Sequence, residues 1–321
     1  MANKHLRIGS RGSDLALWQT NWVKDQLVAR FTDLSVSIEI IKTTGDQALE
    51  TPLSLIGGKG LFTKELEHAL IHGKIDLAVH SLKDLPTELP TGLTLGAITE
   101  REDPRDVFIP HPLNPVKTLS GQVGKAIATG SLRRKSQLLN LNPTLKIVDL
   151  RGNLGTRFRK LDESDWGGMV LASAGVRRLG LEGRVGEYLS LEQMLPAVGQ
   201  GALAIEVRVE DSMTGDVVAA LNHPDTSAAT LAERSLLKSL EGGCQVPIGA
   251  HAHVDPQSQL LRLRALVASL DGMTVVRAEH EGDPAKGNEI GRELAAKLLK
   301  QGAGRILDEI RSTGLMEREG W

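Results

Sequence analysis

The sequence contains a single cysteine, Cys244, among 321 residues, and aromatic side chains make up only 3% of it. One cysteine cannot form a disulfide within the chain and is compatible with a reducing compartment, so we expect a cytoplasmic protein. The scarcity of aromatics argues against stacking platforms for single-stranded nucleic acid. No stretch approaches the roughly 18 apolar residues of a membrane span, and residues 1–8 lack the apolar core of a secretory signal.

Strong charge of either sign is also missing, because 38 basic residues face 40 acidic ones and the net charge is −2. This balance provides no general attraction to nucleic acid or to a membrane, so any basic site must be local. With 40% hydrophobic and 24% charged residues, the composition is that of a folded globular protein. The length predicts two or three domains.

Two stretches repeat one pattern of a short apolar strand, a small polar turn and a helix with arginine near its start. The first begins at residues 6–10 and continues as a helix to about residue 30, and the second begins at residues 126–128. Further strands alternate with helices between them, which predicts α/β domains. A charged, proline-broken stretch at 101–107 is a plausible crossing between domains, and the glycine-rich stretch 196–202 feeds a strand that could return to the first.

The pattern changes after residue 225 to a helix, two alternating strands at 260–266 and 274–279, and a last helix at about 288–300. This order predicts a small α+β domain at the C-terminal end. We therefore expect three domains: residues 1–101 with 200–220, residues 102–199, and residues 221–321.

Basic residues recur where strands end or helices begin, which is where α/β proteins form ligand sites. Arginine forks bind carboxylates in bidentate pairs, so a cluster of them indicates a ligand with several carboxylates or phosphates. A solvated surface charge remains the alternative for any single one. The residues concerned are Arg11, Lys83, Arg133, Arg134, Arg151, Arg157 and Arg178.

One carboxylate, Asp84, stands plainly among these cations, which favour its ionised form. It could pair with a cationic ligand group or accept N–H bonds, or it could simply be a turn aspartate before Pro86. Ser13 has a similar alternative, because either it or Asp14 could cap the helix that follows.

Cys244 lies on a turn between Gly243 and Pro247, where local signals favour a small buried thiol. A cysteine hydrolase would need a partner histidine, and His251, seven residues away, gives no sign of pairing. Residues 251 and 253 alternate as in a strand, but no third ligand is near, so we expect no metal site.

Several motifs, in order along nearly the whole chain, resemble porphobilinogen deaminase, also called hydroxymethylbilane synthase. The matching segments are residues 8–16, 57–62, 79–86, 131–134, 151–153, 196–203 and 240–249. The family's turn before the double arginine commonly reads Gly-Thr-Ser-Ser, whereas this chain has Gly130 at the third position. Some members carry a lysine where this chain has Leu55.

The resemblance implies a transferase that joins four porphobilinogen units head to tail with loss of ammonia, giving hydroxymethylbilane in tetrapyrrole (heme) biosynthesis. It implies a monomer with two domains like type II periplasmic binding proteins around a cleft and a C-terminal domain carrying a dipyrromethane cofactor on Cys244 through a thioether. Asp84 matches the catalytic aspartate. The alternative is a non-catalytic module that clamps a polycarboxylate.

The resemblance also carries further roles to matching positions. The residues that it implies for cofactor binding are Lys83, Asp84, Ser131, Arg133, Arg134, Thr129 and Asp46. Those that it implies for substrate binding are Arg11, Ser13, Gln19, Ser81, Arg151, Arg157, Arg178 and Gln200. Lys59 and Phe62 match a flexible loop.

Overall fold

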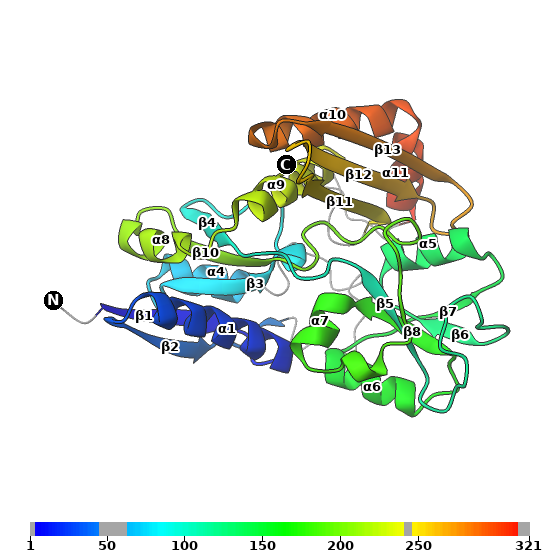
Figure 1. The fold of residues 1–321 in the computed structure, drawn as a ribbon, viewed down its shortest axis with the longest axis horizontal. Helices are drawn as coiled ribbons and strands as arrows, with labels where there is room; N and C mark the ends of the chain where they lie inside the picture. Colours follow the sequence, from blue (N-terminus) through cyan, green and yellow to red (C-terminus); the bar gives the residue numbers. More distant parts are fainter. Residues whose placement is uncertain (1–3, 45–62, 241–245, 314–321) are drawn as a thin grey trace.

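The computed structural model describes residues 4–44, 63–240 and 246–313. Three sheets organise this part of the chain, each in a domain of its own (Figure 1). The expected fold class, two α/β domains with a small C-terminal domain of sheet and helices, is confirmed. None of the described helices is long and apolar enough to cross a membrane.

The first sheet has the strand order β2-β1-β3-β10-β4, in which β1, β2 and β3 are parallel and β10 is antiparallel to both of its neighbours. Its strands are β1 (Lys4–Ser10), β2 (Leu34–Ile40), β3 (Leu77–Ser81), β4 (Leu93–Ile98) and β10 (Leu203–Arg208). Its helices are α1 (Asp14–Arg30), α4 (Lys64–Ile71), the short η1 (Leu82–Asp84) and α8 (Ser212–Ala219). Residues of α1 and α8 share one apolar cluster with the sheet, and residues of α4 share another.

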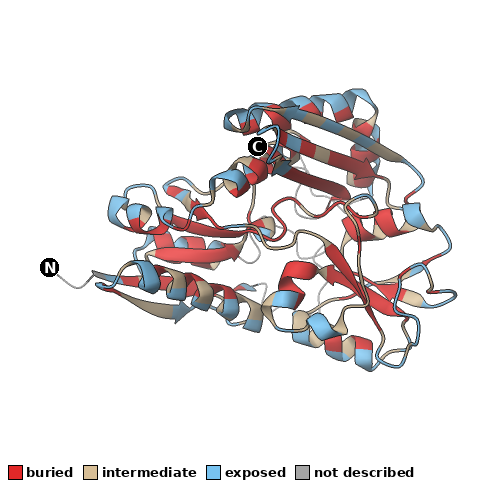
Figure 2. Ribbon diagram, viewed as in Figure 1, coloured by how far each residue is buried: buried red, intermediate tan, exposed pale blue. Residues whose placement is uncertain are grey.

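The second sheet repeats this plan with the order β7-β6-β8-β5-β9. Its strands are β5 (Asp106–Pro110), β6 (Ala126–Ala128), β7 (Lys146–Val148), β8 (Gly168–Ala172) and β9 (Glu187–Tyr188). Its helices are α5 (Leu132–Leu141), α6 (Leu154–Asp162), α7 (Ser173–Arg178) and η2 (Glu182–Arg184). Strand β5 directly follows the predicted crossing, and β10 returns to the first sheet as expected. The central strands of both sheets are buried (Figure 2).

The C-terminal domain packs an antiparallel sheet, β11-β12-β13, against helices. Its elements are α9 (Pro224–Ser239), β11 (Ile248–Val254), β12 (Leu261–Ala268), β13 (Val275–Gly282), η3 (Pro284–Lys286), α10 (Gly287–Lys300) and α11 (Ala303–Ser312). Only the alternation at residues 251–253 indicated β11, and α11 was not predicted. Helix α11 begins after Gly302, whose φ of 105° needs a residue without a side chain.

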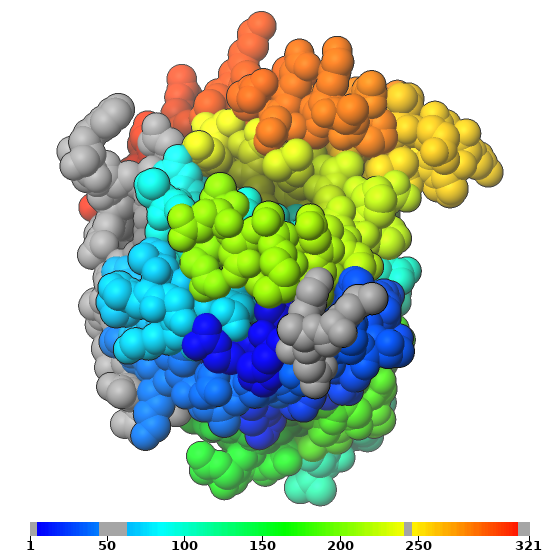
Figure 3. Space-filling view, turned by 90° about the vertical axis from the view of Figure 1, so that its left-hand side faces the viewer, coloured from blue at the N-terminus to red at the C-terminus, as the bar shows by residue number. Residues whose placement is uncertain are grey.

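A buried ion pair joins the C-terminal domain to the other two. Arg101, just after β4, places Nη1 2.6 Å from Glu233 Oε1 of α9. Glu233 also accepts hydrogen bonds from the backbone N–H groups of Gly199 and Ala252. The space-filling view faces the first domain, and the helices of the C-terminal domain, in orange, lie above it (Figure 3).

Candidate active site

The parallel strands of the first sheet end at a common edge, and polar residues follow them there. After β1, Ser13 caps α1, because its side chain accepts a hydrogen bond from the N–H of Ala16 at 3.4 Å. Gln19 of α1 donates from Nε2 to Ser81 Oγ at the end of β3, at 2.8 Å. Two predicted substrate residues, Gln19 and Ser81, are thus brought together, and the cap alternative for Ser13 is confirmed.

The short helix η1 follows β3 directly and presents Lys83 and Asp84. Leu82 anchors it, because this side chain is fully buried in an apolar cluster with Leu85 and Ala202. Burial lowers the pKa of Lys83 to about 8, and the charge of Asp84 opposes that shift. Asp84 is exposed, and no hydrogen bond or ion pair joins it to another residue in the described part of the chain. Its carboxylate therefore stays available to a ligand.

The two arginines that open α5 are buried against a carboxylate that the sequence did not reveal. Asp106, fully buried at the start of β5, accepts from Arg133 Nη1 at 2.7 Å and from Arg134 Nη2 at 2.9 Å. These guanidiniums hold the pKa of Asp106 well below its ordinary range, although burial opposes the shift. The expectation that Asp84 is the one carboxylate among the arginines is therefore wrong. Asp106 neutralises part of their charge.

Three further predicted arginines already make hydrogen bonds or ion pairs with other residues of the chain. Arg151 pairs with Asp149 at 3.0 Å, and Arg157 donates from Nε to the carbonyl of Gly152 at 2.8 Å. Arg178 ends the short α7, where it donates to the carbonyl of Gly201 at 2.7 Å. Burial lowers the pKa of Arg157, and that of Arg178, to about 10.

The pKa shifts indicate which of these charged side chains lie near one another. The charges of Arg134 and Arg151 reinforce the lowering of the Arg157 pKa, whereas Asp84 opposes it. Lys83 likewise responds to Asp84 and Arg134. The first sheet's carboxylate and the second sheet's cations therefore meet in one place. Arg178 also lies over the ring of Trp18 on α1, 5.8 Å from its centroid.

The turn after β6 is held close to the turn after β7. Ser131 caps α5 by accepting from the N–H of Arg134 at 3.4 Å, and Thr129 Oγ1 accepts from the N–H of Ser131 at 3.3 Å. A Cβ atom added at Gly130 would lie 2.5 Å from the carbonyl oxygen of Leu150. The residue that departs from the family's common pattern is therefore the one that permits this close approach.

Three buried polar atoms beside Asp106 have no hydrogen-bond partner among the described residues: Arg134 Nε, Gln200 Oε1 and Ser173 Oγ. Buried polar groups are normally paired, so such atoms indicate a missing ligand or water. Arg134 Nε–H suits a carboxylate, and Gln200 Oε1 suits an N–H group, whereas Gln200 Nε2 already donates to Asp106 at 2.9 Å. Ser173 was missed because no local pattern marks it.

The expected site residues Asp46, Lys59, Phe62 and Cys244 lie outside the described residues, and so does Leu55, where this chain departs from some family members. Arg11 is described and has a polar contact of its own. No group of three or more potential metal ligands occurs within the described ranges.

Two family models together match most of the chain. Residues 6–216 match "Porphobilinogen deaminase, dipyromethane cofactor binding domain", and residues 228–300 match "Porphobilinogen deaminase, C-terminal domain". The chain belongs to the porphobilinogen deaminase family. The curated relative of that name from Pelobacter propionicus is 49% identical to this chain, over 97% of this chain and 98% of the relative. The relative from Chlorobium phaeobacteroides is 52% identical over 97% of this chain and 99% of its own length.

Solved structures show only distant similarity. The sulphonate-binding protein SsuA from Escherichia coli aligns with a TM-score of 0.38 and 16% identity, over 74% of this chain and 71% of that one. The methionine-binding protein MetQ aligns with a TM-score of 0.40 and 13% identity, over 68% and 89%. The family assignment rests on the sequence relatives alone, and it does not favour the non-catalytic binding module.

Proposed function

We infer that this porphobilinogen deaminase family member is a transferase that condenses four porphobilinogen molecules head to tail, releasing ammonia, to give hydroxymethylbilane. The observation that carries this function is the match of both family models and of relatives about 50% identical over the whole chain. The geometry agrees, because each porphobilinogen brings two carboxylates and a cationic amine to a site with several cations and the exposed carboxylate of Asp84.

Asp84 is the residue we propose as catalytic. When ammonia leaves the substrate, positive charge develops on the remaining carbon and pyrrole ring. A carboxylate already in place stabilises such charge without reorganisation, which contributes roughly 10²–10³ to the rate. Because Asp84 is exposed and has no partner within the described ranges, it does not have to leave another contact first.

The dipyrromethane, when bound, supplies the pyrrole carbon to which the first substrate unit is joined. We propose that Cys244 holds it through a thioether. The orphaned Arg134 Nε and Gln200 Oε1 fit its carboxylate and N–H groups. The remaining proposed cofactor residues are Lys83, Asp84, Thr129, Ser131, Arg133 and Asp46.

The proposed substrate contacts divide into two kinds. Arg151, Arg157 and Arg178 bring positive charge to the edge of the second sheet. Gln19 and Ser81 already bond to each other, so their proposed contribution to substrate binding is a fixed pair of polar atoms. Arg11, Ser13 and Gln200 complete the proposed set, and Lys59 and Phe62 are proposed loop residues.

We also propose that the domain boundaries fall at residues 1–101 with 200–220, 102–199 and 221–321. The sheet topology supports the boundary between the first two domains, because the chain enters the second sheet at β5 and returns to the first sheet at β10. A monomer in the cytoplasm, with its single cysteine in a reducing compartment, completes the proposal.

Intact-mass spectrometry tests the function most directly. The purified protein should exceed its sequence mass by one covalently bound dipyrrole, and it should release ammonia from porphobilinogen. Cys244→Ser should remove the added mass. Protein of unmodified mass with no activity on porphobilinogen would disprove the assignment, and a Cys244→Ser variant that keeps its dipyrrole would disprove the attachment site.

A further inference from the structure

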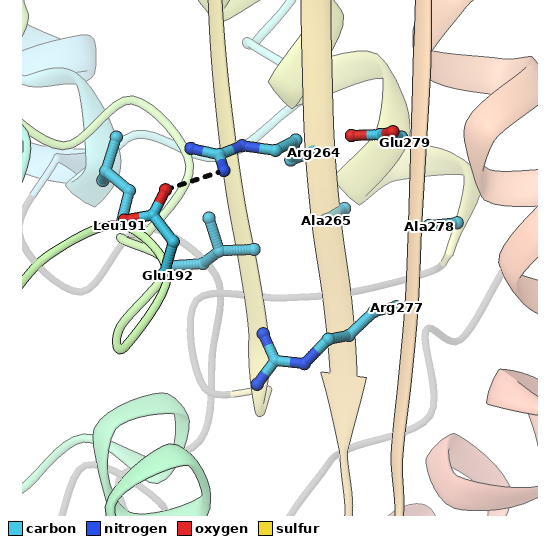
Figure 4. A pocket seen from close by; sticks show the side chains of 8 residues that line it. Leu191, Glu192, Arg264, Ala265, Arg277, Ala278 and Glu279 are labelled. Atoms are coloured by element: carbon cyan, nitrogen blue, oxygen red, sulfur yellow. Dashed lines mark hydrogen bonds and ion pairs between the residues drawn. The ribbon is translucent and has the colours of Figure 1, made fainter. Parts of the chain in front are cut away.

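A cavity of about 300 Å³ lies between the C-terminal sheet and the segment of the second domain that follows β9 (Figure 4). Its volume is at the lower end of the range for small-molecule sites, which often form between domains. It shares none of the residues assigned to the candidate active site. It is lined by Leu191, Glu192, Leu195, Arg264, Ala265, Arg277, Ala278 and Glu279.

Of the two arginines that line this cavity, Arg264 has an ion-pair partner among the described residues and Arg277 has none. Arg264 on β12 bonds Glu192 across the domain boundary at 3.1 Å, and Glu279 on β13 is its neighbour across the two strands. Arg277, also on β13, has no hydrogen bond or ion pair with any described residue. Arg277 is exposed, and the protein around its guanidinium lowers its pKa by partial desolvation. Both arginines extend toward the side of Glu192 (Figure 4).

The lining indicates the chemistry of a ligand. Leu191, Leu195 and two alanines provide an apolar surface, and Arg277 offers a guanidinium fork that binds a carboxylate in a bidentate manner. A volume of about 300 Å³ on an open groove suits a small ligand. We propose that this cavity binds a small amphipathic carboxylate, with its anionic head on Arg277 and its apolar body on Leu191 and Leu195.

Leu195 connects this cavity to the active site. Its carbonyl accepts hydrogen bonds from Arg133 Nη1 at 2.7 Å and from Gln137 Nε2 at 3.0 Å. The same Arg133 nitrogen lies 2.7 Å from Asp106. A ligand seated on Leu195 therefore restrains a residue that positions Arg133, and it bridges the second and C-terminal domains.

Occupancy of the cavity lowers turnover, because the cleft has to accommodate a product that lengthens by one pyrrole at each step. A ligand that holds two domains together opposes that adjustment. This coupling rests on the proposed function, whereas the binding site itself does not.

Benzoate is a suitable probe for the holoenzyme, and two substitutions should shift its affinity in opposite directions. Arg277→Gln removes the bidentate partner and should weaken benzoate binding roughly tenfold. Glu192→Gln removes a competing carboxylate and frees Arg264, so it should strengthen binding. Arg262→Gln is the matched control, since Arg262 lies on the same strand as Arg264, pairs with Glu281 at 3.2 Å and does not line the cavity.

Calorimetric titration measures benzoate binding whether or not the enzyme turns over, and turnover is then measured with saturating porphobilinogen. Support would be a saturable loss of turnover whose midpoint follows the calorimetric affinities in all three variants. Affinities unchanged by Arg277→Gln and Glu192→Gln would overturn the site. Inhibition that vanishes at saturating porphobilinogen would overturn the coupling, because benzoate would then be competing in the cleft. Absence of turnover without benzoate would contradict the proposed function alone.

Discussion

The first and second domains share one strand plan but distribute their charges differently. Leu82 follows β3 and Ser173 follows β8, and their N–H groups bond the carbonyls of Ala202 and Arg105, both at 3.0 Å. In the first domain Asp84 follows this matched point, exposed and without a hydrogen bond or ion pair to any described residue. In the second, Arg133 and Arg134, which follow β6, are buried against Asp106 at the start of β5.

The difference separates two tasks. In the second domain, Asp106 fixes Arg133 and Arg134 in position, so the anion-binding groups are ordered before a ligand arrives. In the first, the exposed carboxylate of Asp84 is the group proposed to stabilise a transient cation. Under the proposed function the site needs both, because ordered cations would hold a growing polycarboxylate while the carboxylate acts on each new unit.

The largest expected effect comes from removing the exposed carboxylate. Asp84→Asn keeps the shape of the side chain but removes its charge, so kcat should fall by roughly 10²–10³ while the covalent dipyrrole remains. Steady-state kinetics and intact mass measure the two quantities. Glu210→Gln, at an exposed position of the same domain, should retain full activity. An Asp84→Asn enzyme within tenfold of normal would contradict the proposed role.

Removing the buried carboxylate should instead affect stability. Asp106→Asn leaves two buried guanidiniums without their anion, which should cost about 3–5 kcal/mol in the free energy of unfolding. Chemical denaturation measures this loss. The matched control is Glu163→Gln in the same domain, because Glu163 and its partner Arg159 are 62% and 64% exposed, so its cost should stay below about 1 kcal/mol. Equal losses of unfolding free energy in the two variants would show that burial does not make the Asp106 pairing more important for stability than an exposed ion pair.

A smaller effect is expected where the second domain's turns touch. Gly130→Ala places a Cβ atom against the Leu150 carbonyl, so the turn that carries Arg151 must move. We expect a KM for porphobilinogen several-fold higher and a loss of about 1–2 kcal/mol in stability. Gly215→Ala, within helix α8, has open space around the added atom, so it should leave KM unchanged and cause no loss of stability. An unchanged KM in Gly130→Ala would show that the turn adapts without moving Arg151.

Sequence patterns predicted the strand-turn-helix units and the return of β10, because hydrophobic periodicity and glycine breaks are local signals. The pairing of Asp106 was not predictable in this way, since its partners lie 27 and 28 residues further along the chain. Ser13 illustrates the opposite case. Its local preference for a helix cap was correct, and it competes with the ligand role that the family resemblance implies.

The smallest expected effect concerns Lys83, the first domain's counterpart to the arginines. Its pKa of about 8 lies below the ordinary lysine value, so between these two pH values the unfolded chain binds more protons than the folded one. This residue's contribution to stability should therefore rise with pH from about 8 to about 10. In the cofactor-free Cys244→Ser background, urea denaturation at several pH values should show this rise, and Lys83→Met should remove it.

Lys74→Met, at an exposed site of the same domain, is the control and should leave the pH dependence as it was. In the holoenzyme the rise should shrink, because the carboxylates of the bound dipyrrole favour the charged amine and raise its pKa again. A pH dependence that is the same with and without the cofactor would mean that Lys83 does not contact it. The lysine would then belong to the protein's own framework rather than to the cofactor site, and its low pKa would reflect burial and the protein's own charges alone.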